Sequence, residues 1–500
     1  MSLDPVALQV TGGALRAACE EMGAVLIRAA HSSNIKERRD CSTALFDAAG
    51  AMVAQAEHIP VHLGAMPAAV AAVLSEDHAP GRSWVLNDPY RGGTHLPDIT
   101  VITPVFERPD GGPLLGFAAS RAHHADVGAR VPGSMPADSR TLDEEGVVIA
   151  PRVLDDAAID ELVARMRGPR QRRADLRAQL AAGAVGVRRL QELAQRLGVD
   201  GLAAATAASL DYAERRARAS LAALPDGTRH ATDVLEAADG DLELRLAATV
   251  AGDRIVLDFT GSAAQHDGNL NCPLAVTRSA CVFAVKVLTD PDLPASAGAH
   301  RPIEVVVPEG SLLHARSPAA VAAGNVETSS RVADLVLAAF GRALGQGTMN
   351  NLTLGNDTFA YYETVGGGQG ASPDADGPSG VHVAMSNTRN TPVEALELEF
   401  PLRCTTYAVR RGSGGAGRHR GGDGVVREFE ALEPMTASLI TERRRHAPPG
   451  AAGGGAGAVG RTLLNGRELP AKWTGKLAPG DRLRLETPGG GGHGTADQEA

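Results

Sequence analysis

The sequence predicts a mixed α+β protein of several domains, and three observations lead to that prediction. Its 500 residues suffice for roughly two to four hydrophobic cores. Residues 156–224 are rich in Ala, Leu, Arg and Glu at helical spacing, whereas the segments before them alternate short apolar runs with turn residues. From about residue 412, short apolar runs alternate with runs of glycine. We therefore expect four parts: a hairpin-rich N-terminal domain (1–155), a helical insert (156–225), a mixed central α/β domain (226–450) and a small glycine-rich β unit (451–500).

The composition argues against some classes of protein. With 49 basic and 59 acidic residues, the net charge of −10 argues against nucleic acid or an anionic membrane as the main partner. No apolar run has the length of a membrane span, and the segment from Met1 to Leu8 lacks the pattern of a signal peptide. The five cysteines are scattered and form no CxxC pair. These features predict a cytoplasmic location with reduced thiols.

The N-terminal part is expected to consist of a long helix followed by hairpins. Apolar residues keep helical spacing from residue 12 to residue 30. We expect strands at 43–46, 52–54, 84–86, 99–106 and 114–119, and a short helix at 66–75. A turn at 109–112 joins the last two strands, so the loop before residue 99 and the loop after residue 119 lie at the same end of this hairpin.

The rest of the chain is expected to mix helices and strands. The helical insert is broken at Gly168-Pro169 and ends at the turn 225–227. We expect antiparallel strands at 244–250 and 255–259, helices at 273–289 and 328–341, and a strand at 305–307. Thr328, Ser329 and Ser330 are candidate N-caps of the helix at 328–341.

Both loops at that end of the N-terminal hairpin contain imidazole and carboxylate groups. The first loop, 87–98, contains His95 three residues before Asp98, on a backbone that Pro and Gly keep out of a helix. The second contains the adjacent pair His123 and His124. Such groups from two neighbouring segments can form a mononuclear divalent-metal site. The alternative is a turn in which Asp98 bonds the backbone and the histidines are structural.

One member of the histidine pair is expected to be the ligand. Adjacent strand residues point to opposite faces, and we favour His123, with His124 as the alternative. A ligating histidine needs an acceptor on its other ring nitrogen, and Asp126 is a candidate.

Two further groups of residues are candidates for the same chemistry. Glu37 could supply another carboxylate ligand, and Arg38 or Arg39 could hold an anion; the alternative is a solvated loop. His58 and His62 flank Pro60, which disfavours the helix that metal binding at a four-residue spacing would need. We therefore expect His58 or His62 to act as a general acid or base.

Other catalytic signatures are missing from the sequence. There is no GxxxxGK[ST] loop, and no GxGxxG lies between a clear strand and a helix. The glycine runs at 366–370, 412–417 and 489–492 are therefore expected to form turns and not to bind a nucleotide. No GxSxG marks a nucleophile.

The order of these segments resembles the hydantoinase B family, also called the oxoprolinase-type B subunits. The matching stretches lie at residues 34–42, 54–64, 87–98, 121–128, 175–179, 258–262, 324–329, 388–394, 413–417 and 488–494. They extend over nearly the whole chain.

The resemblance implies a subunit of an ATP-dependent enzyme. Members pair with an A subunit, similar to actin-like ATPases, which phosphorylates the substrate carbonyl before the B subunit completes the reaction. Oxoprolinase-like and N-methylhydantoinase-like members open a cyclic amide, whereas acetone-carboxylase-like members carboxylate a ketone at a bound divalent metal. By that resemblance the metal, Mn or Zn, is held by Glu37, His95, Asp98 and one of His123 and His124.

The expected function is therefore that of the B subunit of an ATP-dependent cyclic-amide hydrolase acting on 5-oxoproline or a hydantoin. The chain would belong to a hetero-oligomer in which the partner binds ATP. His58 or His62 would transfer protons, and Arg38 or Arg39 would hold an anionic group. The rivals are a ketone carboxylase subunit, which would need bicarbonate, and a scaffold subunit whose histidine loops are structural.

Overall fold

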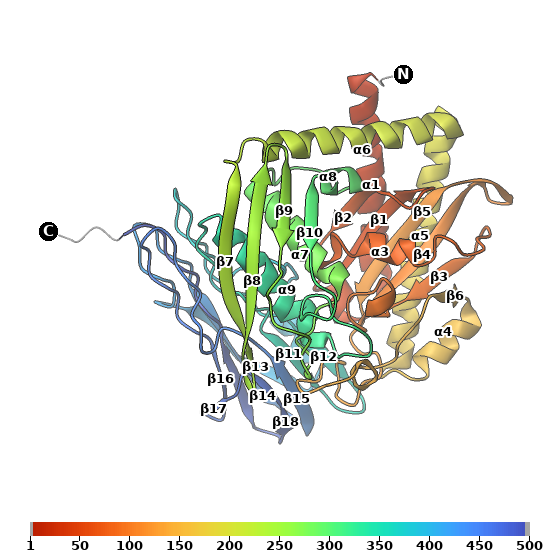
Figure 1. The fold of residues 1–500 in the computed structure, drawn as a ribbon. Coiled ribbons are helices and arrows are strands. Elements are labelled where there is room, and N and C mark those ends of the chain that lie inside the picture. The colour runs from red at the N-terminus through yellow and green to blue at the C-terminus, as the bar shows by residue number, and fades with distance from the viewer. Residues whose placement is uncertain (1–3, 496–500) are drawn as a thin grey trace.

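A computed structural model describes residues 4–495, apart from the side chain of Glu57 (Figure 1). Within these residues the strands form four sheets. Figure 1 shows the N-terminal sheet in orange on one side of the molecule, the C-terminal strands in blue on the other, and a green sheet between them. None of the described helices combines the length and apolar character of a membrane span. The mixture of helices and strands that we expected is confirmed.

The N-terminal sheet contains the strands that position the predicted metal loops. Its antiparallel order is β2 (Met52–Glu57), β1 (Cys41–Asp47), β5 (Gly111–His123), β4 (Asp98–Arg108), β3 (Ser83–Leu86) and β6 (Arg152–Leu154). Helices α1 (Pro5–Ala29) and α5 (Pro169–Leu197) cover one face, and α3 (Met66–Ala71) covers the other. Residues alternate between these faces: Ala118 and Ala122 pack toward α1 and α5, whereas Phe117 and Ala119 pack toward α3.

The helices differ from the expectation at their ends. Helix α1 begins at Pro5, not at residue 12, with the proline in the first turn, where its missing N–H costs no helical bond. The helical insert forms α4 (Asp156–Val163), α5 and α6 (Val199–Leu221), with breaks at Gly168, as expected, and also at Gly198. Helix α5 lies close to the sheet: a Cβ at Gly186 would lie 2.6 Å from the Cβ of Ala118. The hairpins and the insert therefore share one core.

The second sheet has the order β10 (Ile303–Val306), β9 (Arg254–Asp258), β8 (Gly240–Ala251) and β7 (Gly227–Ala237), and only β10 and β9 are parallel. Helices α7 (Leu274–Leu288) and α9 (Ser329–Ala339) pack with it in one core. The expected N-caps of α9 are wrong, because a π-helical turn at Gly324–Thr328 runs directly into the helix. The hydroxyls of Ser329 and Ser330 instead donate to carbonyls one turn back, at 2.6 and 2.7 Å.

The last two sheets pack face to face. One has the order β12 (Ala360–Glu363), β11 (Asn351–Gly355), β15 (Met435–Ile440) and β18 (Lys472–Leu477). The other has the order β13 (Leu402–Arg410), β14 (Gly424–Ala431), β19 (Arg482–Glu486), β16 (Arg461–Leu464) and β17 (Arg467–Leu469). Because β18 pairs with β15 and β19 pairs with β14, the expected boundary at residue 450 cuts both sheets.

The glycine runs pack backbone against backbone. Gly415 donates its N–H to the carbonyl of Gly490 at 2.8 Å, and Gly490 donates to Gly422 at 2.9 Å. A Cβ at Gly421 would lie 1.9 Å from the carbonyl oxygen of Gly490, so a side chain has no room there. These N–H groups are used inside the fold and do not form a phosphate cradle.

Candidate metal centre

The central hairpin of the N-terminal sheet brings a carboxylate and an imidazole together. Strand β4 begins at Asp98 and β5 ends at His123, and the antiparallel register pairs these two residues directly. Paired residues project to the same face of a sheet, so the two side chains are neighbours. At the strand ends, the N–H of His123 donates to the backbone carbonyl of Asp40 at 3.0 Å, and that of His124 to the backbone carbonyl of Pro97 at 2.8 Å. The expected hairpin, with both loops at one end, is confirmed.

The loop before β4 is held in place by Asn87. Its buried amide donates to the carbonyls of Leu96 and Val147 at 2.8 and 2.9 Å, and its oxygen accepts from the N–H of Ile149 at 2.6 Å. These bonds tie both ends of the loop to a neighbouring segment. They fix the backbone from which His95 reaches the carboxylate of Asp98.

The ligand atoms of three residues form an equilateral triangle. His95 Nε2, Asp98 Oδ1 and His123 Nδ1 are each 3.2 Å from the other two. The three residues are at most 2% exposed. Ligands bound about 2.1 Å from one ion lie about 3.0–3.4 Å apart in octahedral or tetrahedral arrangements. Because two imidazole nitrogens and a carboxylate oxygen also suit Zn and Mn, the residues present fit a divalent metal ion.

The charges of the triad suit metal binding. Burial alone would raise the pKa of Asp98, but the attraction of His95 and hydrogen bonds from the surrounding histidines outweigh it and hold that pKa well below its usual value. Burial lowers the pKa of His123. An ionised carboxylate and a neutral imidazole are the forms that bind a metal.

Two further side chains lie against the outer oxygen of Asp98. The hydroxyl of Thr94 donates to Oδ2 at 2.6 Å, and Nε2 of His62 lies 3.5 Å from the same oxygen. The other nitrogen of His62 pairs with the hydroxyl of Ser42 at 2.9 Å. Among the described residues, Nε2 of His62 has no hydrogen-bond partner. The structure thus places His62, one of the two expected proton-transfer residues, beside the triad.

Tyr362, on β12, covers the triad from a distant part of the chain. Its ring stacks on His123 with centroids 4.4 Å apart and planes 13° apart. Its hydroxyl donates to Asn351 at 2.8 Å, and the amide of Asn351 donates to Glu327 at 2.9 Å. No motif in the sequence around Tyr362 marks it as part of the site. The available signal was indirect, since Glu327 lies in one of the stretches that match the family.

Arg38 supports Tyr362 and is not available to hold an anion. It is fully buried, with its guanidinium 4.8 Å from the centre of the Tyr362 ring. One of its NH₂ groups donates to the carbonyl of Tyr362 at 2.8 Å, and the other to the hydroxyls of Thr364 and Thr388 at 2.9 and 3.0 Å. The expectation that Arg38 clamps a substrate is therefore wrong, because these donors already have protein partners.

Other predicted residues lie outside the triad. Glu37 follows the short helix α2 (Ser33–Lys36) and is not among the converging ligand atoms. His124 points to the opposite face from His123 and pairs with Gln179 of α5 at 3.0 Å, so His123 is the histidine of the triad. Asp126 is not the expected acceptor for either histidine. It accepts instead from backbone N–H groups and from Arg167 at 3.1 Å.

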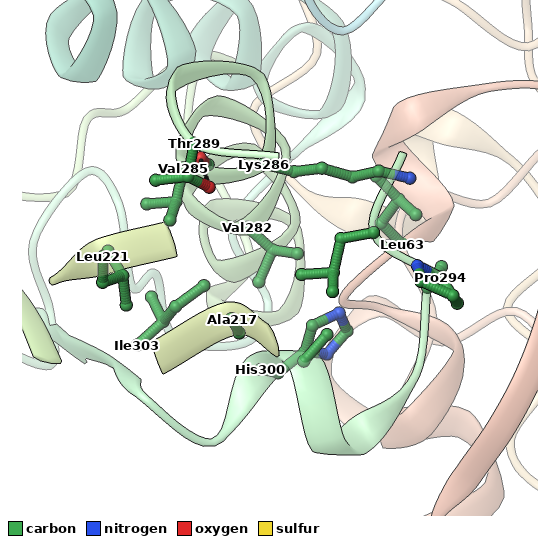
Figure 2. Close-up of a pocket in the computed structure, with 13 residues that line it drawn as sticks. Leu63, Ala217, Leu221, Val282, Val285, Lys286, Thr289, Pro294, His300 and Ile303 are labelled. Carbon is green, nitrogen blue, oxygen red and sulfur yellow. Dashed lines mark hydrogen bonds between the residues drawn. The ribbon is translucent and has the colours of Figure 1, made fainter. Parts of the chain in front are cut away.

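An apolar cavity lined by Leu63, the residue after His62, is too small for a substrate. Figure 2 shows Leu63, Val282 and His300 around it, with Lys286 at its edge. Its volume is about 20 Å³, the space of a single water molecule. No residue of the triad lines it. We therefore do not associate this cavity with the metal centre.

Replacing Tyr362 tests how the triad is supported. We expect Tyr362→Leu to weaken metal binding by up to about tenfold, because an aromatic stack contributes about 0.5–1.5 kcal/mol. Tyr362→Phe keeps the stack and should bind metal nearly as tightly as the wild type. Competition with a chromogenic chelator measures both affinities. Equal metal affinity in all three proteins would show that the ring does not position His123.

The chain belongs to the hydantoinase B/oxoprolinase family, whose model matches residues 4–496. The 5-oxoprolinase 1 of Arabidopsis thaliana is 39% identical over 98% of this chain and 42% of its own length. A protein of Pseudomonas sp. (strain NS671), described as the B subunit of a putative D-/L-hydantoinase, is 29% identical over 98% of this chain and 90% of its own. The chain thus spans less than half of the plant relative but nearly all of the bacterial one.

A solved structure supports the same relationship. The ATP-dependent caprolactamase from Pseudomonas jessenii superimposes with a TM-score of 0.92 at 28% identity. The match covers 99% of this chain and 92% of the other. The expected family membership is confirmed.

Proposed function

We propose that this chain is the B subunit of an ATP-dependent cyclic-amide hydrolase, acting with an ATP-using A-type partner on 5-oxoproline or a hydantoin. The observation that carries the proposal is the buried triad of His95, Asp98 and His123. The names of the relatives and of the superimposable caprolactamase support cyclic amides as the substrate class. The bacterial relative of similar length supports a separate partner, since its name describes a subunit.

In this proposal His95, Asp98 and His123 hold a divalent metal, which supplies Lewis acidity toward a carbonyl oxygen. Thr94 fixes the orientation of Asp98 through its hydrogen bond to Oδ2. His62 exchanges a proton at Nε2, because that atom is buried beside the triad and Ser42 anchors the other nitrogen. The buried surroundings of the triad exclude bulk water, which strengthens each of these electrostatic interactions.

The test is turnover by the chain purified together with its ATP-using partner. We expect ATP-dependent opening of 5-oxoproline or hydantoin that does not change when bicarbonate is removed. Product formation that requires bicarbonate would instead identify a ketone carboxylase subunit. Undiminished turnover by His95→Ala would indicate that the histidine loops are structural, and would contradict the proposed centre.

A further inference from the structure

A positively charged cavity is separated from the metal centre by two side chains, Arg38 and Tyr362. Its volume is about 630 Å³, within the range of small-molecule sites. Arg38, Arg39 and Arg389 contribute to its lining, and no described Asp or Glu does. Burial lowers the pKa of His382, on the same wall, to about 4, so that the positive charge comes from the arginines.

Two arginines of the cavity have no carboxylate partner. Neither Arg39 nor Arg389 forms an ion pair with a described residue; Arg39 is half-buried and Arg389 is exposed. Most of the other described arginines in the chain do form such pairs, for example Arg167 with Asp126 at 3.1 Å. A half-buried guanidinium without a counter-ion at a cavity wall favours an anionic ligand.

Hydrogen bonds within the protein fix the backbone segments that carry these arginines. The N–H of Arg389 donates to the carbonyl of Arg38 at 3.0 Å, and Asn387 donates to the carbonyl of His58 at 2.9 Å. These bonds join two segments that are distant in the sequence. Because the backbone on both sides is fixed, anion binding has to order only the two arginine side chains.

A stack of side chains connects the lining of the cavity to the metal centre. Arg38 lines the cavity and lies over the ring of Tyr362, which in turn stacks on His123. A ligand in the cavity is therefore separated from the centre by two buried side chains, Arg38 and Tyr362. The cavity is thus a site distinct from the metal centre.

We propose that this cavity binds a small anion, a carboxylate or a phosphate, through Arg39 and Arg389. The capacity to bind an anion does not rest on the function proposed above. The role that the sequence suggested for Arg38 or Arg39 thus belongs to Arg39, together with Arg389 from a distant segment.

Calorimetry on the metal-loaded chain tests the proposal with three probes. They are 5-oxoproline, 2-pyrrolidinone, which is the same ring without the carboxylate, and inorganic phosphate. The proteins are the wild type, the double variant Arg39→Gln/Arg389→Gln, and a control with the exposed Arg82 and Arg108 both changed to Gln. Thermal melting of each protein and its metal content show that the fold and the centre are intact.

We expect wild type and control to bind 5-oxoproline at least about tenfold more tightly than 2-pyrrolidinone, as expected for a charge-assisted hydrogen bond. The double variant should lose this difference and bind 2-pyrrolidinone unchanged. If phosphate binds to the wild type and displaces 5-oxoproline, and the variant binds neither, the same arginines also bind a phosphoryl group. If phosphate does not bind, the site is restricted to carboxylates. Two results overturn the proposal. In one, the wild type binds the two rings equally tightly and does not bind phosphate. In the other, the double variant binds anions as tightly as the wild type.

The experiments distinguish a failure of the anion-binding proposal from a failure of the proposed function. Anion binding that depends on Arg39 and Arg389, in a complex that opens no ring, supports the cavity and contradicts the function. Ring opening by a complex that binds no anion through Arg39 and Arg389 supports the function and overturns the cavity.

Discussion

Asp98→Asn is expected to lower turnover by at least about a thousandfold while the protein stays folded. The carboxylate lies between His95 and His123 at 3.2 Å from each ligand nitrogen, and it is the one anionic member of the triad. Asparagine has nearly the same shape and can still accept the hydrogen bond from Thr94. The substitution therefore removes the charge that holds a cation and leaves the packing largely unchanged.

The matched control is Asp110→Asn, at the opposite end of the same hairpin. Asp110 is 82% exposed and pairs only with Arg108 at 3.4 Å, so its charge should not affect turnover. Activity of the complex, metal content and circular dichroism are measured for both variants. An active Asp98→Asn protein with bound metal would contradict the assignment of the triad.

Glu442→Ala is expected to lower the free energy of unfolding by about 3–5 kcal/mol. Glu442 is fully buried between the second sheet and the C-terminal sheets. It accepts from Lys472 at 2.6 Å, from Arg331 at 3.4 Å and from the N–H of Glu236 at 3.1 Å. Removing one partner of a buried ion pair is costly because the remaining charge stays buried without compensation. Here the fully buried Arg331 would keep only its partner Asp233.

An exposed ion pair provides the comparison for Glu442. Glu309 and Arg316 are 3.1 Å apart, with side chains 62% and 61% exposed, so Glu309→Ala should change stability by less than about 1 kcal/mol. Urea unfolding followed by circular dichroism measures both variants. A Glu442→Ala protein as stable as the wild type would show that the buried network does not hold the sheets together.

The metal loops could be predicted from the sequence because they depend on local structure. The turn at 109–112 joins two strands with clear patterns, and their antiparallel pairing brings the ends near Asp98 and His123 together. The alternation of strand side chains predicts that only one of His123 and His124 faces the site, and the observed register with Asp98 shows that it is His123. The break at Gly168 was likewise visible in the local sequence.

The features that escaped prediction depend on contacts between distant segments. Nothing near Tyr362 indicates that it stacks on His123, and nothing near Arg38 indicates that Thr364 and Thr388 bind its guanidinium. Hydrophobic periodicity and turn signals describe neighbours in sequence, so they do not report such pairings. The boundary at residue 450 was misplaced for the same reason, since strand order within a sheet is not encoded locally.

The measurement that tests the metal centre most directly is elemental analysis by plasma mass spectrometry. It compares the purified chain with the double variant His95→Ala/Asp98→Ala and repeats both in complex with the partner. We expect about one divalent ion per wild-type chain and none in the variant. Two results would contradict a metal centre at His95, Asp98 and His123. One is a wild-type chain that contains no metal, either alone or in the complex. The other is a double variant that keeps its metal.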